Sequence, residues 1–150
     1  MGYQYQMEEI ETRKLALYQT VLEESATNKA ACPEGIHEFI AILIDNKLAL
    51  AFPSNVDVTR ISQEFQQKVS AQIPELKRFM NDPEYGVWIS FRLLIDFATG
   101  THLYLFNYDE NVDSFRIQYD NQAYLAELNL FPRFEENIPE WWKHKLTHHE

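Results

Sequence analysis

The histidines near the carboxyl end are the first residues in this sequence whose spacing could support chemistry. His144 and His148 lie four residues apart, and His149 follows directly. Histidines at positions i and i+4 share one face of a helix and can chelate zinc. His37 and His102 have no partner at a comparable spacing. Because a solvated terminal helix explains the pair more simply, we expect no metal site and no cofactor.

Nucleophilic and acid–base catalysis find little support. The single cysteine, Cys32, lies in a polar stretch without a neighbouring base, and the four glycines form neither a Gly-x-Ser-x-Gly turn nor a phosphate-binding loop. The carboxylate pairs Asp109-Glu110 and Glu135-Glu136 would act as acid and base only if burial raised the pKa of one member. Adjacent acids in polar segments usually stay hydrated. We therefore expect no catalytic residues and no enzymatic activity.

Charge and composition narrow the class of protein further. The 150 residues include 23 acidic and 13 basic side chains, a net charge of −10, and the isoelectric point is near 4.9. Such a chain lacks the basic surface that direct binding of nucleic acid requires. One cysteine excludes a disulfide framework, and the longest apolar run, residues 39–44, is too short to cross a bilayer. With no recognisable signal peptide, residues 1–150 are expected to form one cytoplasmic domain without membrane contact.

The elements that position these residues can be read from the hydrophobic spacing. Residues 7–25 predict a helix, and residues 27–35 predict a loop. Residues 37–52 predict a two-stranded hairpin, because Asp45-Asn46 tolerates the positive φ of a two-residue turn. Residues 57–80 carry apolar side chains at spacings of three and four, with Asp57 as the expected N-cap. Pro74 predicts a kink or break near residues 70–73.

The second half predicts another hairpin and two short helices. Residues 87–97 alternate with a period of two, and Gly100 turns the chain into a strand over residues 103–108. Residues 115–119 are a possible fifth strand. Short helices are expected after Asp120 and Asn137. The order α-β-β-α-β-β-(β)-α-α predicts an α+β fold, in which helices pack mainly on one face of an antiparallel sheet of four to five strands.

The last third of the chain combines acids with aromatic residues. Residues 101–150 contain nine acidic and four basic side chains, whereas residues 51–100 contain six and five. Most of the aromatic side chains are expected to fill the core while the acids solvate the rim. A few exposed aromatic side chains within an acidic rim would nevertheless suit the binding of a basic protein.

This region resembles the immunity proteins of bacterial polymorphic toxin systems, above all the group around the YezG-type antitoxins and the immunity partners of contact-dependent growth inhibition toxins. The resemblance rests on the strand pair WISFRLLIDFATGTHLYLFNYDE, on Phe131-Pro132-Arg133 and on Ile138-Pro139-Glu140-Trp141. It covers about the last 60 residues, and the first half agrees only in element order and acidity. It implies a non-enzymatic inhibitor that binds a cognate toxin, often a nuclease, inside the producing cell.

An acidic inhibitor can block a basic nuclease site much as phosphate would occupy it. Charge and aromatic character, rather than the resemblance, select the residues that we expect to contact the toxin. They are Tyr108, Asp109, Glu110, Asp113, Asp120, Phe134, Glu135, Glu136 and Trp142.

Two other classes of function remain open at this point. An acidic secretion chaperone of this size would form a homodimer and hold an unfolded segment of an effector. A small enzyme or ligand-binding domain would need a deep cleft with a desolvated carboxylate or histidine. The sequence does not distinguish a monomer from a homodimer.

Overall fold

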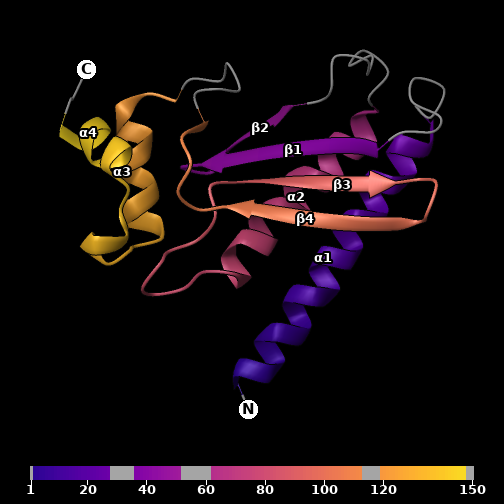
Figure 1. Cartoon of the computed structure of the whole chain (residues 1–150), viewed down its shortest axis with the longest axis horizontal. Coiled ribbons are helices and arrows are strands. Elements are labelled where there is room, and N and C mark those ends of the chain that lie inside the picture. Colours follow the sequence, from indigo (N-terminus) through magenta and orange to yellow (C-terminus); the bar gives the residue numbers. More distant parts are fainter. Residues whose placement is uncertain (1, 28–35, 52–61, 113–118, 148–150) are drawn as a thin grey trace.

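The computed structural model describes residues 2–27, 36–51, 62–112 and 119–147 (Figure 1). In chain order the elements are α1 (Gly2–Thr27), β1 (Ile36–Ile44), β2 (Lys47–Ala51), α2 (Gln63–Phe79), β3 (Ser90–Asp96), β4 (Thr101–Asn107), α3 (Asn121–Leu130), the 3₁₀ helix η4 (Glu135–Asn137) and α4 (Glu140–Thr147). This order and the α+β class confirm the prediction. The possible fifth strand falls mainly on residues 113–118, which lie outside the described part of the chain.

The sheet contains four described strands in the order β2-β1-β3-β4, and every neighbouring pair is antiparallel. Asp45 and Asn46 join β1 to β2 with φ values of 54° and 58°, as the predicted two-residue hairpin requires. The β3–β4 connection contains Gly100 at φ 73°. The two hairpins therefore lie side by side, with β1 and β3 as the central strands.

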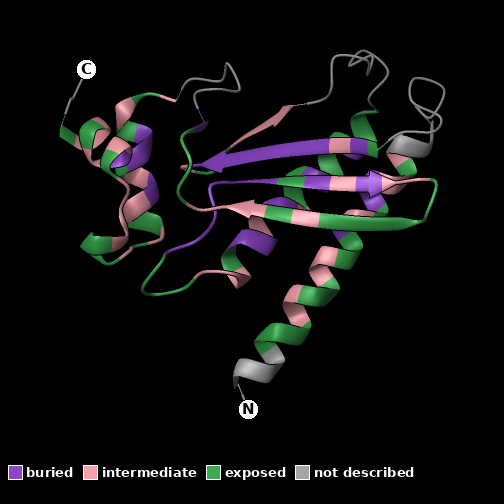
Figure 2. Ribbon diagram, in the orientation of Figure 1, coloured by how far each residue is buried: buried purple, intermediate pink, exposed green. Residues whose placement is uncertain are grey.

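Helices α1 and α2 cover one face of the sheet, which we call the helical face (Figure 1). Alternate residues of each strand point toward these helices, among them Phe39 of β1, Phe91 of β3 and Phe106 of β4. The opposite face is the open face. Its isoleucines on β1 pack against Tyr124 of α3 and Trp142 of α4, but only at the end of the sheet where β1 finishes. The rest of the open face, over β3 and β4, is partly exposed (Figure 2).

Several predicted boundaries differ from the structure. Helix α1 is longer than expected, and α2 is capped by Ser62, whose hydroxyl accepts a hydrogen bond from the Phe65 amide. The predicted N-cap Asp57 lies outside the described residues. Pro74 does not break α2, which runs unbroken from Gln63 to Phe79. Packing of its apolar stripe against the sheet outweighs the one backbone donor that proline removes.

A buried ion pair joins the two sides of the molecule. Nζ of Lys77 on α2 lies 2.7 Å from Oε2 of Glu127 on α3, and their side chains are only 1% and 2% exposed. The same ammonium donates to the carbonyl oxygen of Leu43, and the other carboxylate oxygen accepts from the amide of Asp45 at 2.9 Å. Burial lowers the pKa of Lys77, against the opposing effect of Glu127. The pair therefore fixes α2, α3 and the β1–β2 turn to one another.

Candidate protein-binding surface

Arg133 organises one corner of the molecule beside the end of β4. Its side chain is 2% exposed and donates to three backbone carbonyls, those of Val87 at 3.2 Å, Tyr108 at 2.7 Å and Asn137 at 3.2 Å. Nη1 also lies 3.1 Å from Oδ1 of Asp109. Burial lowers the pKa of the guanidinium, although Asp109 acts in the opposite direction. One buried side chain thus connects the segments before β3, after β4 and after α3.

A tight turn over residues 82–86 completes the corner. Asp82 and Gly86 exchange two backbone hydrogen bonds of 2.7 Å, and Gly86 adopts φ 67°. A Cβ atom at Gly86 would lie 2.6 Å from Cγ of Arg133, so the turn and the guanidinium pack directly. The carbonyl of Glu84 accepts from the amide of Phe134 at 2.9 Å. The turn is therefore held against the segment that contains η4.

We call seven of the exposed residues of these three segments the acidic corner. It consists of five acids and two aromatic residues: Asp82, Glu84, Tyr85, Asp109, Phe134, Glu135 and Glu136. Tyr85 is 53% exposed and Phe134 is 50% exposed. Residues 82–86, 108–110 and 133–137 contain one basic side chain, Arg133, and it is buried. With five acids and one cation, the corner therefore presents net negative charge together with two large aromatic groups.

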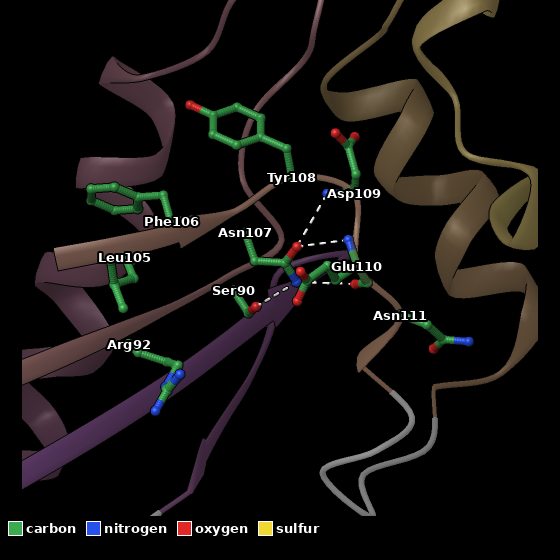
Figure 3. A pocket seen from close by; sticks show the side chains of 9 residues that line it. All are labelled: Ser90, Arg92, Leu105, Phe106, Asn107, Tyr108, Asp109, Glu110 and Asn111. Atoms are coloured by element: carbon green, nitrogen blue, oxygen red, sulfur yellow. Dashed lines mark hydrogen bonds between the residues drawn. The ribbon is translucent and has the colours of Figure 1, made fainter.

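Two hollows adjoin the acidic corner. One, of about 280 Å³, lies between Tyr85, Asp109 and Glu136. The other, of about 510 Å³, lies on the open face at the end of β4 (Figure 3). There the side chain of Asn107 accepts from the amides of Asp109 and Glu110 and donates to the hydroxyl of Ser90. The amide group of Asn107 therefore holds the loop and does not point free into the hollow.

The structure brings together part of the predicted contact set. Asp109, Phe134, Glu135 and Glu136 lie in the acidic corner, and Glu110 is exposed beside it. Tyr108 is half-buried and packs on the core cluster of the helical face. Burial, and after it the charge of Asp82, raises the pKa of the Tyr108 phenol.

Two other predicted residues do not join this surface. Trp142 is fully buried, and its indole donates to the carbonyl of Tyr124 at 3.2 Å. The prediction that Trp142 contacts a partner is therefore wrong. Asp120 is the N-cap of α3 and accepts from the amide of Ala123 at 2.9 Å, which gives its carboxylate a structural role. Asp113 lies outside the described residues.

The sequence analysis missed Asp82, Glu84 and Tyr85, because they lie between the predicted helix over residues 57–80 and the predicted strand over residues 87–97. The available signal was a short polar stretch with a tyrosine next to a glycine, directly before the strongest strand pattern. Its position next to residues 133–137 depends on tertiary packing. The spacing of Asp82, Glu84 and Tyr85 in the sequence therefore gives no indication that they lie next to the rest of the site.

The described residues contain no group of three or more histidine, cysteine, aspartate or glutamate side chains arranged to hold a metal ion. No helix in the described part of the chain is long and apolar enough to span a bilayer. The sequence matches no protein-family model, and no curated protein matches it. Any assignment of function must therefore start from the geometry of the acidic corner.

Proposed function

We propose that this protein is a non-enzymatic, cytoplasmic immunity protein that binds and neutralises a basic toxin of the nuclease class. The acidic corner is the observation that carries the proposal. It offers five exposed carboxylates around Tyr85 and Phe134, with no exposed cation in the same segments. A surface of this kind would be electrostatically complementary to the positive charge with which a nuclease binds phosphate.

The two kinds of side chain have separate tasks in this proposal. The carboxylates accelerate the encounter of the two proteins, because complementary electrostatic fields raise the association rate constant toward about 10⁸ M⁻¹s⁻¹ at low salt. The aromatic side chains supply the affinity, since large groups that become fully desolvated dominate most protein interfaces. Tyr85 and Phe134 begin half-exposed and therefore have apolar area left to bury. Arg133 contributes indirectly, because it holds the three segments in place.

The test is co-expression of this chain with the protein encoded by the neighbouring gene. Under the proposal the pair is viable where the neighbour alone is toxic, and the purified complex weakens as salt rises. Failure of every neighbouring product to bind would refute the assignment. A homodimer that holds only unfolded substrate, measured by light scattering, would instead favour the secretion chaperone.

Matched variants locate the surface. Glu135→Lys/Glu136→Lys should weaken binding by about tenfold or more, mainly through the association rate. Phe134→Ala should weaken the free energy of binding by about 2 kcal/mol, or roughly 30-fold in affinity. Most of this loss should be seen as a faster dissociation rate of the complex. The control Glu23→Lys/Glu64→Lys makes the same change of charge on exposed helical positions away from the corner. Equal effects of the two charge reversals would show that only net charge matters.

A further inference from the structure

Strand β4 forms an unprotected edge of the sheet. Among the described residues it pairs with β3 alone, so alternate backbone N–H and C=O groups point away from the sheet. Its seven residues, THLYLFN, include no charged residue, no proline and no glycine. Natural edge strands are usually blunted by lysine, proline or a bulge, because a bare edge recruits other strands. This edge carries none of these three features.

Two exposed leucines lie on the open face of this edge strand, and Arg92 of β3 lies next to one of them, Leu105, in the strand register. Leu103 is 54% exposed and Leu105 is 41% exposed, and Leu94 of β3 lies next to Leu103 in the strand register. The alternate residues Tyr104 and Phe106 point to the helical face and pack on its core. A strand added beside β4 would therefore extend the backbone ladder and also cover leucine side chains that are now in contact with solvent.

A second copy of this chain does not fit this edge in full register. Two β4 strands paired through all seven residues would be related by a two-fold axis at their central residue, Tyr104. Helix α1 lies under that residue, because the Tyr104 hydroxyl donates to the carbonyl of Lys14 at 2.7 Å. The axis would therefore place the two α1 helices in the same space. Figure 1 shows α1 crossing beneath the sheet and continuing past the β4 edge.

The edge of β4 can instead accommodate one extended segment of a partner protein. That partner must have no helix packed against the segment on the side of the helical face, because α1 occupies this space. The projecting part of α1 would form a shelf beneath such a segment. Glu11 on this shelf is 64% exposed, and its Oε1 lies 3.4 Å from Nζ of Lys14 on the same helix. Burial raises the pKa of Tyr104, and the charge of Glu11 is the next cause, which places Glu11 near the edge. Glu8 and Met7 are also exposed on the preceding turn. With Glu8 and Glu11 set against Lys14, this shelf carries a net negative charge and therefore favours lysine or arginine side chains on the segment.

The edge leads directly into the acidic corner, because Asn107 ends β4 and Tyr108, Asp109 and Glu110 follow. We propose that the toxin adds one extended strand to β4, with apolar side chains over Leu103 and Leu105 and basic side chains toward the α1 shelf. Backbone pairing provides affinity and the alternate side chains provide specificity in this mode of binding. The inference rests on the proposed function, and it adds the location and conformation of the contact.

Hydrogen exchange tests the backbone pairing directly. The probe is the toxic protein encoded by the neighbouring gene, inactivated at its own catalytic site and mixed with the full chain. Amides of residues 101–107 that point away from β3 should exchange fast in the free protein and at least about tenfold more slowly in the complex. A complex in which these amides exchange at the free rate would overturn strand addition while leaving the proposed function intact. Absence of any complex would overturn both.

A matched pair of variants tests the side chains. Leu103→Lys/Leu105→Lys should weaken the complex by about tenfold or more, because it charges the edge and removes the apolar cover. The control Leu125→Lys/Leu130→Lys changes two similarly exposed leucines of α3 and should alter affinity less than about twofold. Thermal unfolding of each free variant shows whether the fold is kept. Equal affinities of the two folded variants would contradict the inference, as would protection of β4 without any loss on substitution.

Discussion

Removal of one member of the buried Lys77–Glu127 pair should destabilise this protein more than any surface change. In Lys77→Met the methionine can still pack near the Trp88 and Phe131 rings, which lie 5.6 Å and 5.3 Å from the ammonium. The carboxylate of Glu127, however, keeps only the amide of Asp45 as a hydrogen-bond partner among the described residues. An uncompensated buried charge of this kind costs about 3–5 kcal/mol. For a chain of this size that lowers Tm by roughly 6–20 °C.

The double variant Lys77→Met/Glu127→Leu separates charge from packing. It removes both charges, so the penalty of an isolated ion disappears. The amide of Asp45 and the carbonyl of Leu43 then lack these partners, which costs about 1–3 kcal/mol for each group. Each single variant already leaves one of these two groups without its partner and has the isolated charge in addition. The double variant should therefore be more stable than either single variant, which is the opposite of additivity.

Denaturation in urea, followed by circular dichroism, measures all three free energies of unfolding. The control is Glu64→Gln, which breaks an exposed pair with Lys68 at 3.3 Å and should cost about 0.3–0.5 kcal/mol. The reasoning is refuted if the single buried variants lose no more than this control. It is also refuted if the double variant loses the sum of the two single variants.

Three further predictions concern the turn, a helix cap and a phenol. Gly86→Ala should lower the free energy of unfolding clearly more than Gly100→Ala, as measured by thermal unfolding. Both positions have positive φ, but only a Cβ atom at Gly86 would meet Arg133. For Gly100→Ala we expect a loss of about 1–2 kcal/mol. Asp120→Asn should keep the stability of α3 whereas Asp120→Ala should lose about 1 kcal/mol by urea denaturation, since asparagine caps as well as aspartate. Burial raises the pKa of Tyr119 to about 12, so the folded state keeps a proton that the unfolded state releases above about pH 10. Stability should consequently fall between pH 10 and 12, and Tyr119→Phe should flatten that fall in unfolding curves measured across this range.

The sequence predicted the parts of the fold that depend on local spacing. The eleven-residue alternation around β3, the Asp45-Asn46 turn and the stripe on α2 each reflect a period that burial imposes on neighbouring residues. Element ends were less accurate. Capping at Ser62 involves the Glu24 carboxylate of α1, which accepts from both the Ser62 amide and its hydroxyl at 2.9 Å. That contact joins residues 38 positions apart and leaves no local signal.

The site was only partly predictable for the same reason. Acidity near the carboxyl end pointed to Asp109, Glu135 and Glu136, which lie in the acidic corner. The same criterion selected Trp142, because residue type cannot distinguish an exposed aromatic side chain from a buried one. It also overlooked Tyr85, whose neighbours in space come from a segment about 50 residues away.

The anchoring of the corner has an evolutionary consequence. Arg133 donates hydrogen bonds to three carbonyl oxygens of the main chain. Every amino acid has such an oxygen, whatever its side chain. The outward side chains beside those places can therefore be exchanged without loosening the anchors, provided that Arg133 and the bare Gly86 remain. The binding properties of this surface can therefore change by substitution alone while the scaffold stays the same.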